Sequence, residues 1–195
     1  MRMTYCKMLI LGTLVGCAGL GAVAQQRMIE DNGLKFRYSD SAGVTASYLG
    51  HFGDSLGVPS LARLDGGVIG PAELRGKVVV FNFWFTACKP CVAEIPVLNR
   101  LVGAYRSDSV VFVAVTWDKK EKIEAFLASR RFDFTIVQLG REDIQQMKKV
   151  SFYPLTAIVD RHGRISFVVF GRRASEGDEE FYAVLDRQLR RAMAE

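Results

Sequence analysis

The chain has 195 residues, of which 49% are hydrophobic and 24% are charged, and its formal net charge is +5. This composition supports one folded domain with an extension and excludes an intrinsically disordered protein. The basic residues are interleaved with acidic ones and form no uninterrupted basic face, which argues against a nucleic-acid-binding protein.

The start of the chain has the pattern of an export signal. A basic beginning is followed by an apolar stretch over residues 8–20, which is too short for an ordinary membrane span. Residues 1–24 are interpreted as a signal peptide, cleaved after Ala24 in a small-x-small context. The alternative is a lipoprotein signal that ends before Cys17, which would then carry the lipid anchor. Both interpretations predict an exported, periplasmic protein, either soluble or lipid-anchored, in an oxidising compartment.

The next stretch predicts little regular structure. Residues 25–57 are rich in Gly, Ser and Asp, and they are interpreted as an N-terminal extension with one strand or hairpin around 34–38. The main domain is expected over 58–195. It opens with a short strand, a tight turn at 64–67 and a second turn at 74–77.

From residue 77 onwards, strand and helix patterns alternate. The continuous apolar run over 77–85 predicts a central buried strand, and apolar residues at three- and four-residue spacing predict a helix immediately after it. The order β-α-β-α-β-α-β-β-α predicts an α/β fold, with a parallel sheet covered by helices and extended by an antiparallel hairpin. The later elements are expected at 110–116 (strand), 118–127 (helix with an Asp118–Glu121 capping box), 132–139 (strand), 141–150 (helix), 155–160 and 165–170 (strands), and from Ser175, capped with Asp178, to the end (helix).

Two cysteines, Cys88 and Cys91, stand in a Cys-x-x-Cys pair between the buried strand and the helix. A cysteine at a helix start is favoured as a thiolate by the exposed N–H groups and by the helix dipole. Cys88 is therefore predicted to attack a substrate disulfide, and Cys91, one turn deeper, to resolve the mixed disulfide. A purely structural disulfide is the alternative, but one that closes so short a loop stabilises little.

The residues around the pair carry a family resemblance. The pattern Asn82-Phe83-Trp84, then Cys88-x-Pro90-Cys91, then Glu94 and Pro96 resembles the active site of the thioredoxin superfamily. The segments 74–80 and 153–165 extend the resemblance, which covers roughly residues 58–192. It is strongest to the exported TlpA/ResA-type thiol–disulfide oxidoreductases. It implies a thioredoxin-like fold: a central mixed β-sheet flanked by helices, with an N-terminal strand or hairpin extension and an inserted βα unit.

The resemblance also implies roles for single residues. Glu94 would be a partly buried carboxylate with a raised pKa that moves the proton of Cys91. Pro154 would be a cis-proline that leaves the backbone of Tyr153 able to pair with an extended substrate segment. The further substrate-binding positions are Trp84, Lys89 and Pro90. Ala87 departs from the family, which often has tryptophan there, and Tyr153 is bulkier than expected, so both residues bear on substrate preference.

These observations predict an exported protein-disulfide oxidoreductase without a cofactor or metal. The resemblance further implies that it reduces disulfide-containing partner proteins and receives electrons from a membrane thiol-transfer protein. A thiol peroxidase on the same fold is one alternative, although Phe85 occupies the position, three residues before the first cysteine, where the peroxidases of this fold have threonine. A metal-delivery or binding module is the other, although two cysteines supply half of a tetrahedral site and His51 and His162 lack motif spacing.

Overall fold

The computed structural model describes most of the expected domain and parts of the extension. The described residues are 26–31, 34–39, 47–48, 56, 58–106, 109–148, 152–172 and 177–195. The expected signal segment with Cys17 lies outside them, as does the expected cap residue Ser175. Among the helices of the described residues, none combines the length and apolar character needed to cross a membrane.

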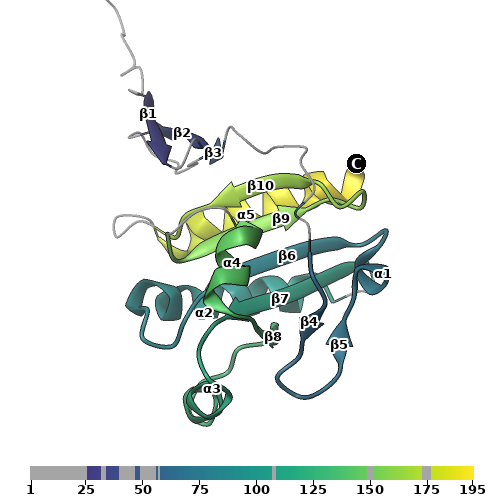
Figure 1. Cartoon of the computed structure of the whole chain (residues 1–195). Coiled ribbons are helices and arrows are strands. Elements are labelled where there is room, and N and C mark those ends of the chain that lie inside the picture. The colour runs from purple at the N-terminus through teal and green to yellow at the C-terminus, as the bar shows by residue number, and fades with distance from the viewer. Residues whose placement is uncertain are drawn as a thin grey trace, which may run out of the picture.

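A five-stranded mixed sheet with strand order β10-β9-β6-β7-β8 forms the centre of the molecule (Figure 1). The parallel strands are β6 (Val78–Phe83), β7 (Val110–Thr116) and β8 (Thr135–Gln138). β9 (Leu155–Val159) runs antiparallel to β6, and β10 (Ile165–Val169) antiparallel to β9. Every residue of β6 is buried, as its continuous apolar run predicts.

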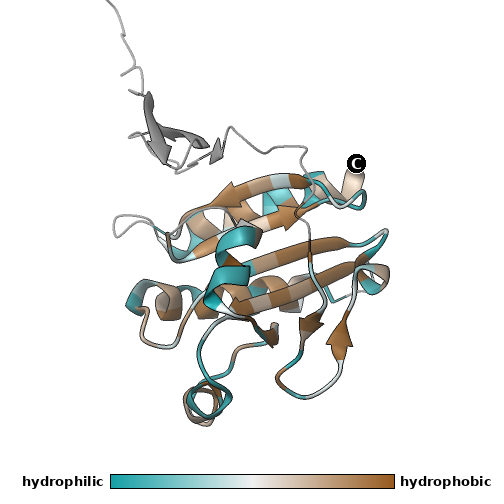
Figure 2. Cartoon of the chain, in the orientation of Figure 1, coloured by the Kyte–Doolittle hydropathy of each residue, from teal (hydrophilic) through white to brown (hydrophobic). Residues whose placement is uncertain are grey.

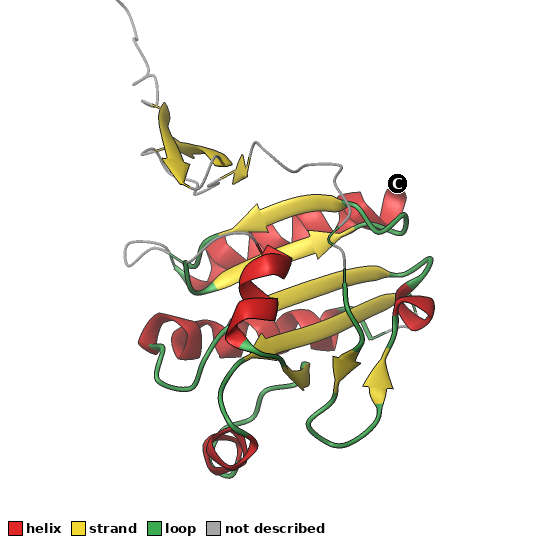
Figure 3. Cartoon of the chain, viewed as in Figure 1, coloured by secondary structure: helices red, strands yellow, loops and turns green. Residues whose placement is uncertain are grey.

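Helices cover both faces of this sheet (Figures 1 and 3). The long helices α2 (Lys89–Ala104) and α5 (Asp178–Ala194) pack side by side on one face, and α4 (Arg141–Lys148) lies on the other. This arrangement confirms the predicted α/β class with a central mixed sheet flanked by helices. The smaller elements are α1 (Pro71–Leu74), α3 (Lys120–Leu127), β4 (Leu61–Ala62) and β5 (Val68–Ile69).

The N-terminal extension contains a small sheet of its own. β1 (Gln26–Asp31) pairs antiparallel with β2 (Leu34–Ser39), which pairs in turn with β3 (Ser47–Tyr48). The strand or hairpin expected around residues 34–38 is thus present. The boundary between this extension and the main domain stays a prediction.

Alternating residues of the buried strands supply two separate cores, one on each face of the sheet. Val78 and Val80 of β6 join the core beneath α2 and α5, whereas Val79 and Phe81 join the core beneath α4 and the β4–β5 ribbon. Figure 2 shows the sheet strands as mostly hydrophobic and α4 as mostly hydrophilic. The two-residue period of a strand explains how one apolar run serves both cores.

Some predicted element ends are wrong. The N-cap of α3 is Lys119, and Asp118 does not form the expected capping box with Glu121, because its carboxylate binds Thr86 instead. β8 begins at Thr135 rather than at Phe132: Phe132 is buried in the core through its side chain without joining the ladder.

The strand register brings three loops to one edge of the sheet. Phe83, the last residue of β6, pairs with Val115 near the end of β7 and with Leu155 at the start of β9. The loop into α2, the loop after β7 and the loop before β9 therefore meet at this edge. It holds the cysteine pair.

Candidate active site

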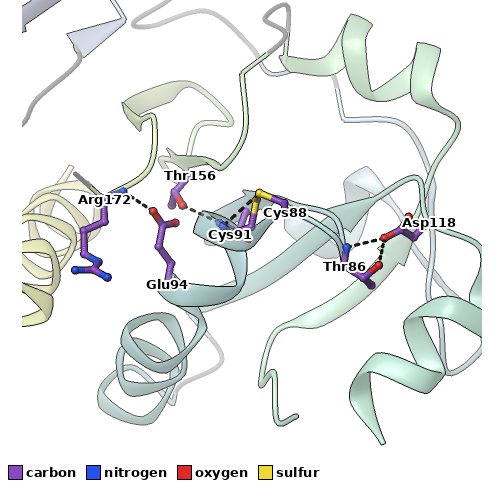
Figure 4. The surroundings of a disulfide bond; sticks show 8 residues. Thr86, Cys88, Cys91, Glu94, Asp118, Thr156 and Arg172 are labelled. Atoms are coloured by element: carbon purple, nitrogen blue, oxygen red, sulfur yellow. Dashed lines mark hydrogen bonds between the residues drawn. A yellow bond between two sulfur atoms is a disulfide. The ribbon is translucent and has the colours of Figure 1, made fainter. Parts of the chain in front are cut away.

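Cys88 and Cys91 are joined by a disulfide at the first turn of α2, with their Cα atoms 5.2 Å apart (Figure 4). Cys88 is the N-cap residue of the helix, and its Sγ accepts a hydrogen bond from the backbone N–H of Cys91 at 3.2 Å. This contact offers a helix-terminal N–H to a sulfur that would be negatively charged in the reduced protein.

Both cysteines are nearly buried, although the residues around them are exposed. Cys88 is 5% exposed and Cys91 is 2% exposed, and both belong to the core beneath α2 and α5. Ala87, Lys89 and Pro90 are all exposed around them. The pair is therefore set into the surface, with Cys88 beside its exposed rim and Cys91 one turn further into the helix.

Glu94 lies one turn beyond Cys91 on the buried face of α2 and is only 1% exposed. Its Oε1 accepts a hydrogen bond from the backbone N–H of Arg172 (Figure 4). A Cβ atom at Gly171 would lie 3.2 Å from this oxygen and 3.0 Å from Pro154 Cγ, so glycine is what lets the three segments approach. Glu94 is thus buried more completely than the partial burial that the resemblance implies.

The peptide bond between Tyr153 and Pro154 is cis, as the resemblance implies. Pro154 is buried and Tyr153 is half-buried, directly before β9. Because Leu155 pairs with Phe83, this bond lies beside the strand that leads to Cys88.

Trp84 has no exposed surface and packs against Phe126 and Phe132, with ring centroids 5.2 Å and 5.3 Å away. A fully buried ring does not contact a substrate, so its assignment as a substrate-binding residue is corrected to support from the core. Lys89 and Pro90, by contrast, are exposed between the cysteines.

Asp118 is a site residue that the sequence analysis missed. Its Oδ2 accepts hydrogen bonds from the backbone N–H and the hydroxyl of Thr86 at 2.6 Å and 2.7 Å (Figure 4). Lys122 Nζ donates to Asp118 Oδ1 at 2.9 Å. Burial alone would raise the pKa of this carboxyl, but the hydrogen bonds from Thr86 and Lys122 outweigh it and hold that pKa below its ordinary value. The sequence contained a signal for this contact, because Thr86 and Asp118 each follow a strand of the parallel part of the sheet. The C-terminal ends of parallel strands lie at the same edge of the sheet.

An aromatic cluster beside the pair was also missed. The rings of Phe85, Trp117 and Tyr153 touch one another, and the guanidinium of Arg141 lies 4.6 Å from the Trp117 ring centroid. Burial raises the pKa of Tyr153 to about 12, against a smaller opposing effect of the Arg141 charge, so this phenol is neutral at physiological pH.

Of the two histidines, only His162 is among the described residues, and it takes no part in the site. His51 lies outside the described residues. His162 is exposed in the β9–β10 turn, where its backbone N–H donates to Asp160 Oδ1. No three His, Cys, Asp or Glu side chains of the described ranges come together as a metal site would require.

Comparison with known proteins places this geometry in a family. Residues 52–168 match the model of the AhpC/TSA family. A ResA thiol–disulfide oxidoreductase from Geobacillus kaustophilus is 31% identical over 55% of this chain, and the match spans 63% of that relative, less than two thirds. The ResA protein of Halalkalibacterium halodurans is 31% identical over 64% of this chain and 72% of the relative.

Solved structures agree with this placement. A candidate thiol:disulfide interchange protein DsbE from Chlorobium tepidum aligns with a TM-score of 0.64 and 25% identity, over 72% of this chain and 96% of that one. A thioredoxin-like structure from Neisseria meningitidis aligns with a TM-score of 0.59 and 25% identity, over 72% and 94% of the two chains. With its Cys-x-x-Cys disulfide at the start of α2 and its cis-proline beside it, the chain belongs to the AhpC/TSA family and, within it, to the thioredoxin-like thiol–disulfide oxidoreductases.

Proposed function

We propose that this protein is an exported oxidoreductase that reduces disulfides in specific partner proteins. The observation that carries the proposal is the Cys88–Cys91 disulfide, whose Cys88 sulfur accepts a helix-terminal N–H beside an exposed rim. The pair closes too short a loop for a useful structural crosslink, whereas a helix start is where reactive thiolates are found.

The reaction begins with both cysteines reduced. The Cys88 thiolate attacks one sulfur of a substrate disulfide, a mixed disulfide forms, and the other substrate sulfur leaves as a thiolate. The Cys91 thiolate then attacks the Cys88 sulfur, which restores the disulfide described above and releases the second substrate thiolate. Two electrons pass to the substrate, and its two thiolates take up the protons given up by the cysteines.

Glu94 is proposed as the group that accepts the proton of Cys91. Its carboxylate is one helical turn away, almost fully buried, and held in place by the Arg172 backbone N–H. A buried carboxylate so close to the resolving thiol can take its proton while water is excluded.

Substrate binding is proposed at the exposed rim and at the cis-proline. Lys89 and Pro90 are exposed next to the pair, and the backbone of Tyr153 lies directly before β9, where an extended segment can add hydrogen bonds. Each turnover leaves the chain oxidised, so a dithiol donor must reduce it again. A membrane thiol-transfer protein is the proposed donor.

Residues 1–24 are proposed to be a signal peptide that directs export. The alternative is a lipoprotein signal that ends before Cys17, which would then carry a lipid anchor. The catalytic unit is proposed to be residues 58–195. In an oxidising compartment the disulfide forms readily, so the donor rather than the surroundings would keep the pair reduced.

Two variants test the function through the reduction of insulin disulfides by the reduced full chain. Cys88→Ser is expected to abolish the reaction, because the attacking sulfur is gone. Cys91→Ser is expected to accumulate a mixed disulfide between Cys88 and an insulin chain, seen by non-reducing electrophoresis and mass spectrometry. Circular dichroism checks the fold of both variants, and full activity of a folded Cys88→Ser protein would refute the proposal.

A further inference from the structure

Three aromatic side chains from separate loops form a continuous wall next to the cysteine pair. The ring centroids of Phe85 and Trp117 are 4.7 Å apart, those of Trp117 and Tyr153 4.8 Å, and those of Phe85 and Tyr153 5.6 Å. All three residues are half-buried, so part of the wall is exposed at the surface.

This wall lies where a partner would approach the reactive sulfur. Phe85 accepts the backbone N–H of Cys88 through its carbonyl, and Tyr153 directly precedes Pro154. The rings of Phe85 and Tyr153 pack against the core that contains both cysteines. Ala87 is exposed and small, so its side chain does little to screen the wall from the approach to Cys88.

Arg141 adds a fixed positive charge to the wall. It is the first residue of α4, it is exposed, and its guanidinium carbon lies 4.6 Å from the Trp117 ring centroid. A guanidinium stacked on an indole keeps its N–H edge available for a carboxylate, and the stacking reduces the entropy lost when that carboxylate binds.

This charge has no internal partner in the described part of the chain. The adjacent acidic residues of α4, Glu142 and Asp143, are exposed and form no ion pair with Arg141 there. The nearest acidic residue after Trp117 is Asp118, which is buried and already bound by Thr86 and Lys122.

Two lysines add further positive charge on the loops that carry Cys88 and Trp117. Lys89 is exposed between the two cysteines, and Lys119 is exposed two residues after Trp117. The aromatic wall is therefore accompanied by three exposed cations, Arg141, Lys89 and Lys119, which can pair with acidic residues of an otherwise apolar segment.

We infer that Arg141, held over Trp117, makes this protein prefer target disulfides whose flanking residues are acidic. The occupant is an extended segment of a partner protein, with its cysteine at Cys88 and a carboxylate on the Arg141 guanidinium. The inference rests on the proposed disulfide reduction and deepens it, since it names the chemistry of the preferred substrate. Arg141 acts as a specificity determinant and takes no part in electron transfer.

The test uses the reduced full chain and two synthetic peptides, each with one internal disulfide. The peptides are identical except that Glu in one replaces Lys in the other at the positions flanking the cysteines. The second-order rate of peptide reduction is measured by stopped flow at low and high salt. We expect the Glu peptide to react about two- to fivefold faster, as for an exposed ion pair, and the difference to shrink with salt.

Two matched variants assign the effect to one arginine. Arg141→Gln is expected to remove most of the difference between the peptides, and Arg141→Lys to retain part of it because the charge remains. Arg130→Gln is the control: Arg130 also stacks on a ring, that of Phe126 at 4.9 Å, but lies outside the aromatic wall. It is expected to leave the difference intact.

Hydroxyethyl disulfide, which is uncharged, separates failure of this inference from failure of the proposed function. The inference alone is overturned if the protein reduces this compound but reduces the two peptides at equal rates. It is also overturned if the difference between the peptides persists in Arg141→Gln. If the wild-type protein reduces neither the compound nor the peptides, the proposed function falls and the inference falls with it.

Discussion

At the scale of single residues, two buried carboxylates flank the disulfide and each accepts a backbone N–H. Glu94 binds the N–H of Arg172 in the loop after β10, and Asp118 binds that of Thr86 in the loop before the pair (Figure 4). Each carboxylate satisfies a loop N–H that would otherwise be costly to bury. Together they hold the segments on both sides of the pair.

We predict that Asp118→Asn lowers the free energy of unfolding by about 1–3 kcal/mol at neutral pH, because charge-assisted bonds to Thr86 and Lys122 are lost. The folded-state pKa of Asp118 lies below its ordinary value of 3.8, so its stabilisation is complete above that value and is lost as pH falls through the folded-state pKa. Urea unfolding of both proteins at pH 7 and below pH 3.8 measures the difference, which should shrink in acid.

Asp65→Asn is the control for this prediction. Asp65 is also paired, to Arg63, but its side chain is 65% exposed and solvent screens the pair. The control should change stability much less than Asp118→Asn at neutral pH. Equal losses in the free energy of unfolding for the two substitutions would show that the buried contacts of Asp118 stabilise the protein no more than an exposed pair does. A loss for Asp118→Asn that is the same in acid as at neutral pH would show that the charge of Asp118 does not contribute.

At the scale of helices and strands, local patterns predicted the elements and non-local contacts decided their details. The run over Val110–Thr116 gave a strand with those bounds, because a buried β-branched segment needs no outside information. The capping box at Asp118 failed because the carboxylate binds Thr86, 32 residues earlier in the chain. A cap is a local prediction that a distant partner can override.

The same distinction applies to the candidate site. The spacing of Cys88 and Cys91 and the strand before them are local features, so the sequence could predict the pair and its place at a helix start. The contact of Trp117 with Phe85, Tyr153 and Arg141 depends on which strands are neighbours in the sheet. Periodicity carries no information about strand order, so the aromatic wall could not be predicted from it.

The junction of α2 and α5 offers a prediction at this scale. The Tyr105 hydroxyl, at the end of α2, donates to Asp186 Oδ1 of α5 at 2.5 Å. Tyr105→Phe keeps the ring packing and removes this bond, so we expect a loss of about 1 kcal/mol in the free energy of unfolding by urea. Arg191→Gln, which removes an exposed pair with Glu195 at the C-terminal end of α5, is the control and should change the free energy of unfolding little. If Tyr105→Phe changes it no more than this control does, the bond does not help to join the helices.

At the scale of the whole molecule, one sheet separates two cores that share its strands. Leu185 of α5 is fully buried in the first core and Ile144 of α4 in the second. Because successive residues of β6 enter opposite cores, neither core can be lost while the other keeps its strand intact. The two faces should therefore unfold together, as small domains usually do.

Ile144→Ala tests this coupling with a reporter on the opposite face. In a Trp117→Phe background, Trp84 is the only tryptophan and lies in the first core. Removing the buried side chain from the second core should cost about 2–5 kcal/mol. The urea midpoint should shift equally by Trp84 fluorescence and by circular dichroism, with the disulfide intact throughout. In the control Val68→Ala, at a site 55% exposed, the free energy of unfolding should stay within about 0.5 kcal/mol of that of the Trp117→Phe background.

If the urea midpoint from Trp84 fluorescence stays unchanged in Ile144→Ala while the midpoint from circular dichroism shifts, the two faces unfold separately.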